Sequence, residues 1–215
     1  MVNNNSFDQW EISEEIITAI KNKGWVTPTD IQIDSIPFVL SGTDILAQAK
    51  TGSGKTAAFG IPAIDRCIDE KSVQVLILTP TRELASQVSE ELNWLKGSKK
   101  INIDAFYGGV GIEPQIKKLE SGTQIVVGTP GRVIDLIRRE HLDINNLKML
   151  ILDEADRMLD MGFFPDVQWI MNKSNSERQT LLFSATFPQE ILDVSSEMMK
   201  EPEHVLSSQF EVEVP

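Results

Sequence analysis

The stretch DILAQAKTGSGKTAAFGIPAI, residues 44–64, decides the fold. It begins with a short apolar run, continues through a glycine-rich segment, and resumes apolar residues at helical spacing from Lys55. A short apolar run bounded by turn residues is typical of a buried strand, whereas a longer periodic segment is typical of a helix. We therefore predict a strand over Asp44–Gln48, a tight loop, and a helix over Lys55–Asp69.

Similar apolar, β-branched-rich runs recur along the chain and alternate with helical patterns. Further strands are predicted at Val73–Thr79, Ile101–Phe106, Gln124–Gly128, Met149–Leu152 and Thr180–Ser184. Further helices are predicted at Arg82–Lys96, Glu113–Leu119, Arg132–Arg139 and Gln189–Lys200. Alternating strands and helices favour a parallel sheet, and strands without polar alternation are usually covered on both faces. The predicted fold class is α/β, with three layers around a central, mostly parallel sheet.

The composition of the 215 residues, 41% of them hydrophobic, suits a sizeable globular core. No stretch approaches the roughly 20 apolar residues of a membrane span, and the first ten residues do not resemble a signal peptide. We expect a soluble, cytoplasmic protein with no membrane partner. The single cysteine, Cys67, cannot form an internal disulfide, and its apolar neighbours indicate a buried thiol within the first long helix.

The charge balance is acidic, because 20 Lys and Arg face 32 Asp and Glu, for a net charge of −12. Such a charge disfavours binding of nucleic acid by overall attraction. The basic doublets are short and dispersed, as expected of solvated faces. Any contact with nucleic acid must therefore come from a few well-placed groups.

The glycine-rich segment has the residues of a phosphate-binding loop in the required context, after a strand and before a helix. Its members are Ala49, Lys50, Thr51, Gly52, Ser53, Gly54, Lys55 and Thr56. In such a loop, backbone N–H groups surround the phosphates, the lysine meets the β- and γ-phosphates, and the hydroxyl at Thr56 binds Mg²⁺. The first position is Ala49, where the general pattern has glycine.

Two acidic residues, Asp153 and Glu154, directly follow the strand Met149–Leu152. Ligand sites of open α/β sheets lie beyond the carboxyl ends of the strands, so these residues should face the same crevice as Lys55. Asp153 is then expected to hold Mg²⁺, through water, and Glu154 to act as general base on the attacking water. We predict Glu154, Lys55 and Asp153 as catalytic residues. Taken alone, the acidic run would also suit the start of a helix.

The sequence Asp153-Glu154-Ala155-Asp156, with other motifs between about Phe7 and Thr186, closely resembles the DEAD-box ATP-dependent RNA helicases. The resemblance implies a RecA-like P-loop NTPase lobe that uses ATP and Mg²⁺.

Residues 24–32, GWVTPTDIQ, resemble the Q motif of that family, with Phe7 as its upstream aromatic residue. By resemblance Gln32 reads adenine, Thr27 and Pro28 support it, and an aromatic ring, Phe7 or Trp25, packs against the base. The family usually has Phe at the position of Trp25. If Gln32 were an ordinary surface amide, ATP and GTP would bind alike.

Three further segments resemble motifs of the family that contact RNA, and each follows a predicted strand. The residues concerned are Pro80, Thr81, Arg82, Gly108, Gly109, Thr129, Pro130, Gly131 and Arg132. Their N–H groups, hydroxyls and guanidinium groups suit binding of phosphates without reading bases. Each segment alone also has an ordinary interpretation as a helix start, a turn or a surface charge.

Ser184-Ala185-Thr186 resembles the family motif that couples ATP state to unwinding, and its hydroxyls could bond Asp156. A capping turn is the alternative interpretation of these three residues.

The expected organisation is an N-terminal extension at residues 1–40 that carries the Q motif and packs on the lobe, a helicase lobe at residues 41–207, and an exposed tail at 208–215. Within the extension, Ile12, Ile16, Ile17 and Ile20 have helical spacing. The family's second lobe supplies arginines in a pattern resembling His-Arg-x-x-Gly-Arg-x-x-Arg. Neither histidine, His141 or His204, is followed by arginine, so we expect this lobe to be absent and ATP turnover to be very slow.

The expected function of the complete protein is RNA-stimulated ATP hydrolysis coupled to local RNA unwinding or remodelling of RNA–protein complexes, with sequence-independent RNA contacts and a second lobe as partners. Two alternatives remain open at this point. One is an ATP-dependent RNA clamp that binds without needing turnover, and the other is a P-loop ATPase that acts on DNA or on no nucleic acid.

Overall fold

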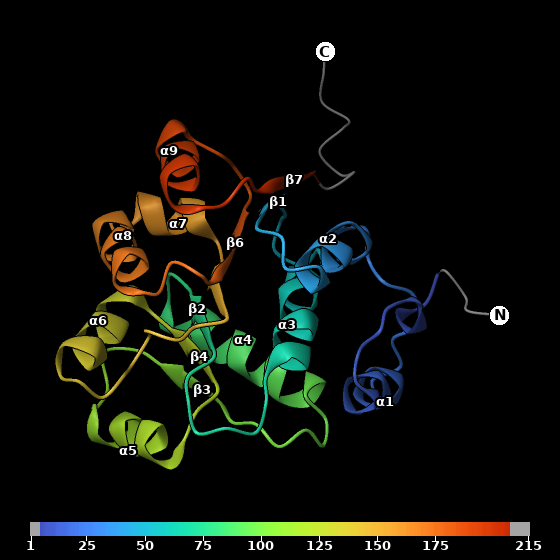
Figure 1. Cartoon of the computed structure of the whole chain (residues 1–215), viewed down its shortest axis with the longest axis horizontal. Helices are drawn as coiled ribbons and strands as arrows, with labels where there is room; N and C mark the ends of the chain where they lie inside the picture. The colour runs from blue at the N-terminus through green and yellow to red at the C-terminus, as the bar shows by residue number, and fades with distance from the viewer. Residues whose placement is uncertain (1–4, 207–215) are drawn as a thin grey trace.

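A central sheet of seven strands organises the computed structural model, which describes residues 5–206. The strands are β1 (Ile45–Gln48), β2 (Val75–Leu78), β3 (Ile103–Phe106), β4 (Ile125–Gly128), β5 (Met149–Leu152), β6 (Gln179–Ser184) and β7 (Glu203–Leu206). Their order across the sheet is β3-β4-β2-β5-β6-β1-β7, and all six pairings between them are parallel (Figure 1). The predicted α/β class is confirmed.

Helices cover both faces of the sheet (Figure 1). One face packs against α2 (Asp30–Leu40), α3 (Lys55–Arg66) and α4 (Arg82–Leu95), and α1 (Glu14–Asn22) joins the same core by packing against α4. The other packs against α5 (Glu113–Ser121), α6 (Pro130–Arg138), α7 (Ala155–Asp160), α8 (Phe164–Lys173) and α9 (Gln189–Met198). Alternate residues of a strand point to opposite faces, so Met149 and Ile151 join the first core while Leu150 and Leu152 join the second. The predicted three layers are therefore present.

Five elements were not predicted from the sequence: the 3-10 helix Phe7–Gln9, α2, α7, α8 and β7. Helix α2 contains Pro37, a residue that usually interrupts helices, yet Thr29 and Gln32 form a capping box that marks its start. Helix α7 has only six residues, too few for a periodic pattern. Strand β7 is an edge strand in which only Val205 is buried. The predicted tail at 208–215 lies outside the described residues.

Helix α3 ends at Arg66, three residues earlier than predicted, and Cys67 is extended rather than helical. The carbonyls of Ile64 and Asp65, which a longer helix would use, accept hydrogen bonds from Nζ of Lys99 at 2.7 and 2.9 Å. The N–H of Ile68 donates to the side chain of Gln74 instead. Cys67 is buried as predicted, and burial raises the pKa of its thiol to about 12.

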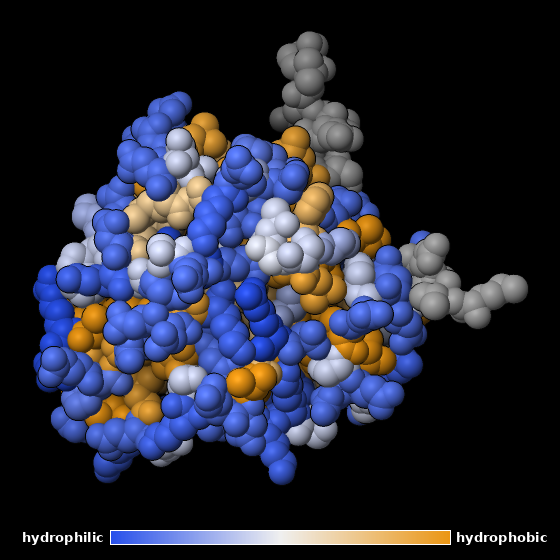
Figure 2. Space-filling model, in the orientation of Figure 1, coloured by the Kyte–Doolittle hydropathy of each residue, from blue (hydrophilic) through white to orange (hydrophobic). Residues whose placement is uncertain are grey.

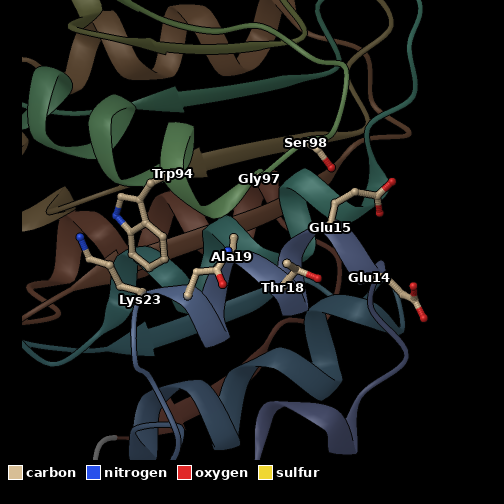
Figure 3. Close-up of a pocket in the computed structure, with 9 residues that line it drawn as sticks. Glu14, Glu15, Thr18, Ala19, Lys23, Trp94, Gly97 and Ser98 are labelled. Atoms are coloured by element: carbon tan, nitrogen blue, oxygen red, sulfur yellow. The ribbon is translucent and has the colours of Figure 1, made fainter.

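The N-terminal segment packs on the lobe through α1, which lies beside the end of α4 (Figure 3). The backbone N–H of Ser13, just before α1, donates to Asp65 of α3 at 2.8 Å. Gly97 has a φ of +55°, and a Cβ there would lie 2.5 Å from the carbonyl oxygen of Glu15, so only glycine allows this close approach. A groove of about 880 Å³ runs along the contact, lined by Glu14, Glu15, Thr18, Ala19, Asn22, Lys23, Trp94, Gly97 and Ser98.

Hydrophilic residues cover most of the face shown in Figure 2. Between residues 5 and 206, no helix is both long enough and apolar enough to cross a membrane. The larger side chains of the core are enclosed by the two helical layers.

Candidate active site

The glycine-rich loop joins β1 to the first turn of α3 at the carboxyl edge of the sheet. Gly54 is the N-cap of α3, with a φ of +86° that favours glycine. A Cβ at Gly54 would lie 2.7 Å from Oγ1 of Thr29 and 2.8 Å from Nε2 of Gln32. Both the loop conformation and the close contact with Thr29 and Gln32 therefore require glycine at this position.

Lys55 and the two acidic residues after β5 converge on one point. Nζ of Lys55 lies 2.8 Å from Oδ1 of Asp153 and 3.3 Å from Oε1 of Glu154. The side chains of Lys55 and Asp153 are only 7% and 1% exposed. The structure thus brings together the three residues that the sequence analysis assigned to catalysis.

The carboxylate of Asp153 is enclosed and poorly satisfied. Burial raises its pKa, and this effect exceeds the opposing influence of Lys55 at 2.8 Å. Neither oxygen of Asp153 accepts a hydrogen bond of good geometry from the described residues, so its one close ionic contact there is Lys55. A buried carboxylate in this state suits an additional cation.

A cavity of about 330 Å³ opens above these groups. Its lining comprises Thr51, Gly52, Gly54, Lys55, Thr56, Leu84, Gln87, Val88, Glu91, Asp153 and Glu154. Thr56 and Asp153 therefore share one cavity wall with the glycines of the loop. Hydroxyl and carboxylate oxygens are the ligands that Mg²⁺ prefers, so the residues present fit a magnesium ion.

Glu154 is held in an uncommon backbone conformation. Its φ and ψ of 53° and 53° are left-handed, which is costly for a residue with a side chain and is often found at functional sites. Its Oε1 accepts a hydrogen bond from Oγ1 of Thr51 at 2.9 Å, and its Oε2 lies 3.5 Å from Arg157. The strained turn thus points the carboxylate back at the glycine-rich loop.

Gln32 lies under the loop rather than at the surface, with 2% exposure. Its Oε1 accepts from the N–H of Thr29 at 3.0 Å, and its Nε2 donates to the carbonyl of Gly54 at 3.1 Å. Both ends of the amide are therefore engaged within the protein. Of its two predicted neighbours, Pro28 is buried and Thr27 is exposed.

The two aromatic residues assigned to the base lie together but away from Lys55. The rings of Phe7 and Trp25 stack with centroids 6.2 Å apart, and Trp25 meets Trp94 edge-on at 4.9 Å. Phe7 and Trp25 line a separate cavity of about 160 Å³. The structure does not bring these rings into the cavity that contains Lys55 and Asp153.

The residues assigned to RNA follow β2, β3 and β4 at the same edge of the sheet. Thr81 caps α4 by accepting from the N–H of Leu84, and the exposed guanidinium of Arg82 lies 4.8 Å from the centre of the Tyr107 ring. Gly108 and Gly109 are exposed in the turn after β3. This edge of the sheet therefore presents an exposed cation and open backbone.

Helix α6 begins at Pro130, two residues before the predicted start, so Arg132 lies in its first turn. The guanidinium of Arg132 donates to Oε1 of Gln115 at 3.1 Å and to the carbonyl of Val110 at 3.0 Å. Arg132 thus holds the glycine turn, and two of its nitrogens are used within the protein. Thr129 is bound to β3, because its N–H donates to the carbonyl of Phe106.

The predicted bonds to Asp156 are present. Oδ2 of Asp156 accepts from Oγ1 and N–H of Thr186 at 3.0 and 3.2 Å, and the N–H of Asp156 donates to Oγ of Ser184 at 3.0 Å. The turn after β6 is thereby fixed to the turn after β5.

Comparison with known proteins identifies the family of this arrangement. The sequence model of the DEAD/DEAH box helicases matches residues 29–194. The chain belongs to the DEAD/DEAH box helicase family. A probable ATP-dependent RNA helicase of Methanocaldococcus jannaschii is 50% identical over 195 residues, which cover 90% of this chain and 53% of the relative. The DEAD-box ATP-dependent RNA helicase CshA of Streptococcus pneumoniae is 47% identical over 200 residues, which cover 93% of this chain and 38% of the relative.

Solved helicase structures share the fold. The crystal structure of a DEAD box protein from the hyperthermophile Methanococcus jannaschii superposes with a TM-score of 0.92 at 47% identity, covering 95% of this chain and 56% of that one. The crystal structure of a hypothetical ATP-dependent RNA helicase from Sulfolobus tokodaii superposes with a TM-score of 0.85 at 36% identity. The match covers 91% of this chain and 57% of that one. The RecA-like fold is thus confirmed, and the chain spans about half the length of these relatives or less.

Helix α4 of this DEAD-box lobe builds one wall of the cavity, which was not predicted from the sequence. Leu84, Gln87, Val88 and Glu91 line the same cavity as the glycines of the loop. Residues three, four and seven positions apart lie on one face of a helix. Because α4 starts at the carboxyl end of β2, that spacing could have indicated a face turned towards the phosphates.

The Gly54→Ala variant is expected to lower the free energy of unfolding by about 1–3 kcal/mol, because a side chain at this φ is strained and would displace Thr29 and Gln32. Urea unfolding followed by circular dichroism measures the effect. Gly111→Ala is the matched control, since a Cβ at Gly111 meets no atom within 4 Å. Equal stability of the two variants would contradict the strain assigned to Gly54.

Proposed function

We propose that this chain is the nucleotide-binding N-terminal lobe of an ATP-dependent RNA helicase. The observation that carries the proposal is the convergence of Lys55, Asp153 and Glu154 beside the glycine-rich loop. Two similar proteins are named as ATP-dependent RNA helicases, and the chain spans about half of their length or less. Their names support the same function for the complete protein. We also propose a cytoplasmic location, where ATP and RNA are both available.

Phosphates and Mg²⁺ would replace the ion pair between Lys55 and Asp153. The ammonium of Lys55 would turn from the carboxylate to the β- and γ-phosphates, and Asp153 would hold the cation with Thr56. When bound, Mg²⁺ neutralises charge that develops on the phosphate oxygens. The poorly satisfied oxygens of Asp153 support this exchange, because they gain a cation in place of one ammonium.

Glu154 would act on the attacking water. Its carboxylate, held by the Thr51 hydroxyl and the strained turn, orients the water and accepts its proton. Arg157 lies 3.5 Å from the same carboxylate but is largely exposed, so its influence is screened by solvent. Thr51, at 2.9 Å, and the buried Lys55, at 3.3 Å, are therefore the closer restraints on Glu154.

Adenine would be read by the free half of the Gln32 amide. An amide has two N–H hydrogens and an oxygen with two lone pairs, and the contacts with Gly54 and Thr29 use one of each. The remaining hydrogen and lone pair match the adjacent acceptor and donor of adenine. Since Gln32 also holds Gly54, recognition of the base would reach the phosphate loop directly.

RNA would bind along the same edge of the sheet through phosphate contacts. Arg82, the start of α4 and the turn at Gly108 and Gly109 offer a cation and backbone groups that do not read bases. Arg132 would act mainly by holding that turn. The bonds of Asp156 with Ser184 and Thr186 link the strand ends on which the nucleotide would act.

A second lobe would complete the enzyme. In phosphoryl-transfer enzymes, an arginine supplied by a partner domain contributes roughly a 10³-fold rate increase or more. We propose that the chain alone binds ATP and ADP but hydrolyses ATP very slowly. RNA unwinding is then a property of the complete protein.

Nucleotide discrimination tests the proposal on the chain itself. In the presence of Mg²⁺, we expect fluorescent ADP to bind and to outcompete GDP, and Gln32→Ala to reduce this preference by about 10-fold, the effect of roughly one hydrogen bond. The measured quantity is the ratio of ADP to GDP affinity. Gln189→Ala, at an exposed position of α9, should leave the ratio unchanged. Equal wild-type affinity for the two nucleotides would refute the adenine assignment, and no binding of either would refute the function.

A further inference from the structure

Gln115, on α5, contacts two segments of the sheet edge that is proposed to bind RNA, and none of the motifs contains it. Its side chain is buried, with 6% exposure, and both ends of its amide are used. Its Nε2 donates to the carbonyl of Tyr107 at 3.0 Å, and its Oε1 accepts from Nη1 of Arg132 at 3.1 Å. One buried amide therefore joins the segment after β3 to the first turn of α6, which follows β4.

The contacts of Gln115 and Arg132 hold the glycine turn at both of its ends. Gln115 binds the carbonyl of Tyr107, and Nη2 of Arg132 donates to the carbonyl of Val110 at 3.0 Å. These two carbonyls lie on either side of the adjacent glycines in the turn, and the two side chains that bind them are bonded to each other. One connected pair of side chains thus fixes the whole turn.

The turn needs such a restraint because of its composition. Gly108, Gly109 and Gly111 all lie in it, and glycine loses more conformational freedom on folding than any other residue. The N–H groups of Gly108 and Gly109 donate no hydrogen bond to the residues that the structure describes, and both glycines are exposed. A Cβ at either one would meet no atom within 4 Å. The turn therefore offers two unused donors beside open space.

We propose that Gln115 is a positioning residue for RNA, which together with Arg132 presets the N–H groups of the adjacent glycines for a phosphate. The inference rests on the proposed function of the chain. Successive N–H groups of a turn can form a concave site for an anion. A turn that is already fixed needs no ordering when RNA binds, whereas a mobile turn must be ordered at that moment, which weakens binding. Gln115 itself does not touch RNA, and it acts through the turn.

Arg82 provides an independent contact for comparison. Its guanidinium lies 4.8 Å from the centre of the Tyr107 ring, and that ring packs against the core shared with α3 and α4. Arg82 therefore keeps its support when Gln115 is changed. Arg82→Ala should weaken RNA binding and reduce the slope of log affinity against log salt concentration by about 0.7, the value for one phosphate contact with a single strand. Neutral N–H groups carry no such ionic contribution, so the two kinds of contact are distinguishable.

The test is the concentration of single-stranded RNA that gives half-maximal ATPase stimulation of the complete protein. Gln115→Met has a side chain of similar length but makes neither hydrogen bond, and it should raise this concentration by about 3- to 10-fold, the effect of roughly one hydrogen bond. The ATPase rate at saturating RNA, the affinity for ADP and the salt slope should stay as in wild type. Gln189→Met, at an exposed position of α9, is the control and should behave as wild type.

A double-mutant cycle separates positioning from general damage to the fold. Gln115→Met should add no further loss of RNA affinity to Arg132→Met, whereas its loss should add to that of Arg82→Ala. Unchanged RNA affinity in Gln115→Met, additive losses with Arg132→Met, or an equal fall in ADP affinity would each overturn the inference. If Gln115→Met does not fold, Arg132→Met alone must lower RNA affinity at an unchanged saturating rate, or the inference fails. A wild-type enzyme that RNA does not stimulate would instead refute the proposed function itself.

Discussion

The Lys55→Ala variant is expected to lose about 3–5 kcal/mol of unfolding free energy, even without nucleotide. The reason is the burial of its partner, because Asp153 is 1% exposed and its close ionic contact in the described chain is Lys55 at 2.8 Å. Removing the ammonium leaves an uncompensated carboxylate inside the protein, and Glu154 adds a second negative charge nearby. The phosphate-binding lysine is thus also a structural residue of the nucleotide-free lobe.

Urea unfolding of the variant measures this loss, with the exposed Lys100→Ala as control. The double variant Lys55→Ala, Asp153→Ala should be more stable than Lys55→Ala alone, because it removes the orphaned charge together with its partner. ADP affinity should fall by roughly 10- to 100-fold in any variant that lacks Lys55, as expected for a charge-assisted hydrogen bond. A Lys55→Ala variant within about 1 kcal/mol of wild type would show that water relieves Asp153.

The Glu154→Gln variant of the complete protein is expected to hydrolyse ATP roughly 10²- to 10⁴-fold more slowly, with ATP binding retained. A glutamine has the same shape, and its carbonyl still accepts from Oγ1 of Thr51, so the turn is preserved while the base is lost. Hydrolysis is measured in the presence of single-stranded RNA, and binding is measured with fluorescent ATP.

Arg157→Ala is the control for that experiment, because this exposed residue contacts Glu154 at 3.5 Å and should change the rate little. DNA of the same sequence should stimulate the wild-type enzyme less than RNA, since 2′-hydroxyl contacts distinguish the two. Full activity of Glu154→Gln would remove Glu154 from its proposed role. Equal stimulation by DNA would contradict the assignment to RNA.

Several details of the site could not be derived from the sequence. Gln32 stays predicted to read adenine, but the sequence does not show that Thr29 and Gly54 also engage its amide. Arg132 stays predicted to bind phosphate, but the sequence does not show that its guanidinium also donates to the carbonyl of Val110. In both cases residue type indicated a capacity for hydrogen bonding, but the partner depends on which loops meet. Which loops come into contact is set by packing between segments that are far apart in the sequence. Local sequence patterns do not predict such packing.

The sequence by itself determined the features that neighbouring residues create. The run before the glycine-rich loop, the loop and the start of α3 were predicted because each depends on spacing within a few residues. The same holds for β5, whose unbroken apolar run both forms the strand and places Asp153 at its end. Local backbone preferences and the period of apolar residues are sufficient for these elements.

Only the tertiary structure decided how these pieces meet. The early end of α3 required Lys99, the enclosure of Asp153 required Lys55, and the α4 wall of the cavity required α4 to pack beside α3. Such contacts join residues whose separation along the chain carries no periodic signal. They arise because the sheet and its two helical layers can be filled at close packing in one arrangement, and that arrangement selects which polar groups share a buried space.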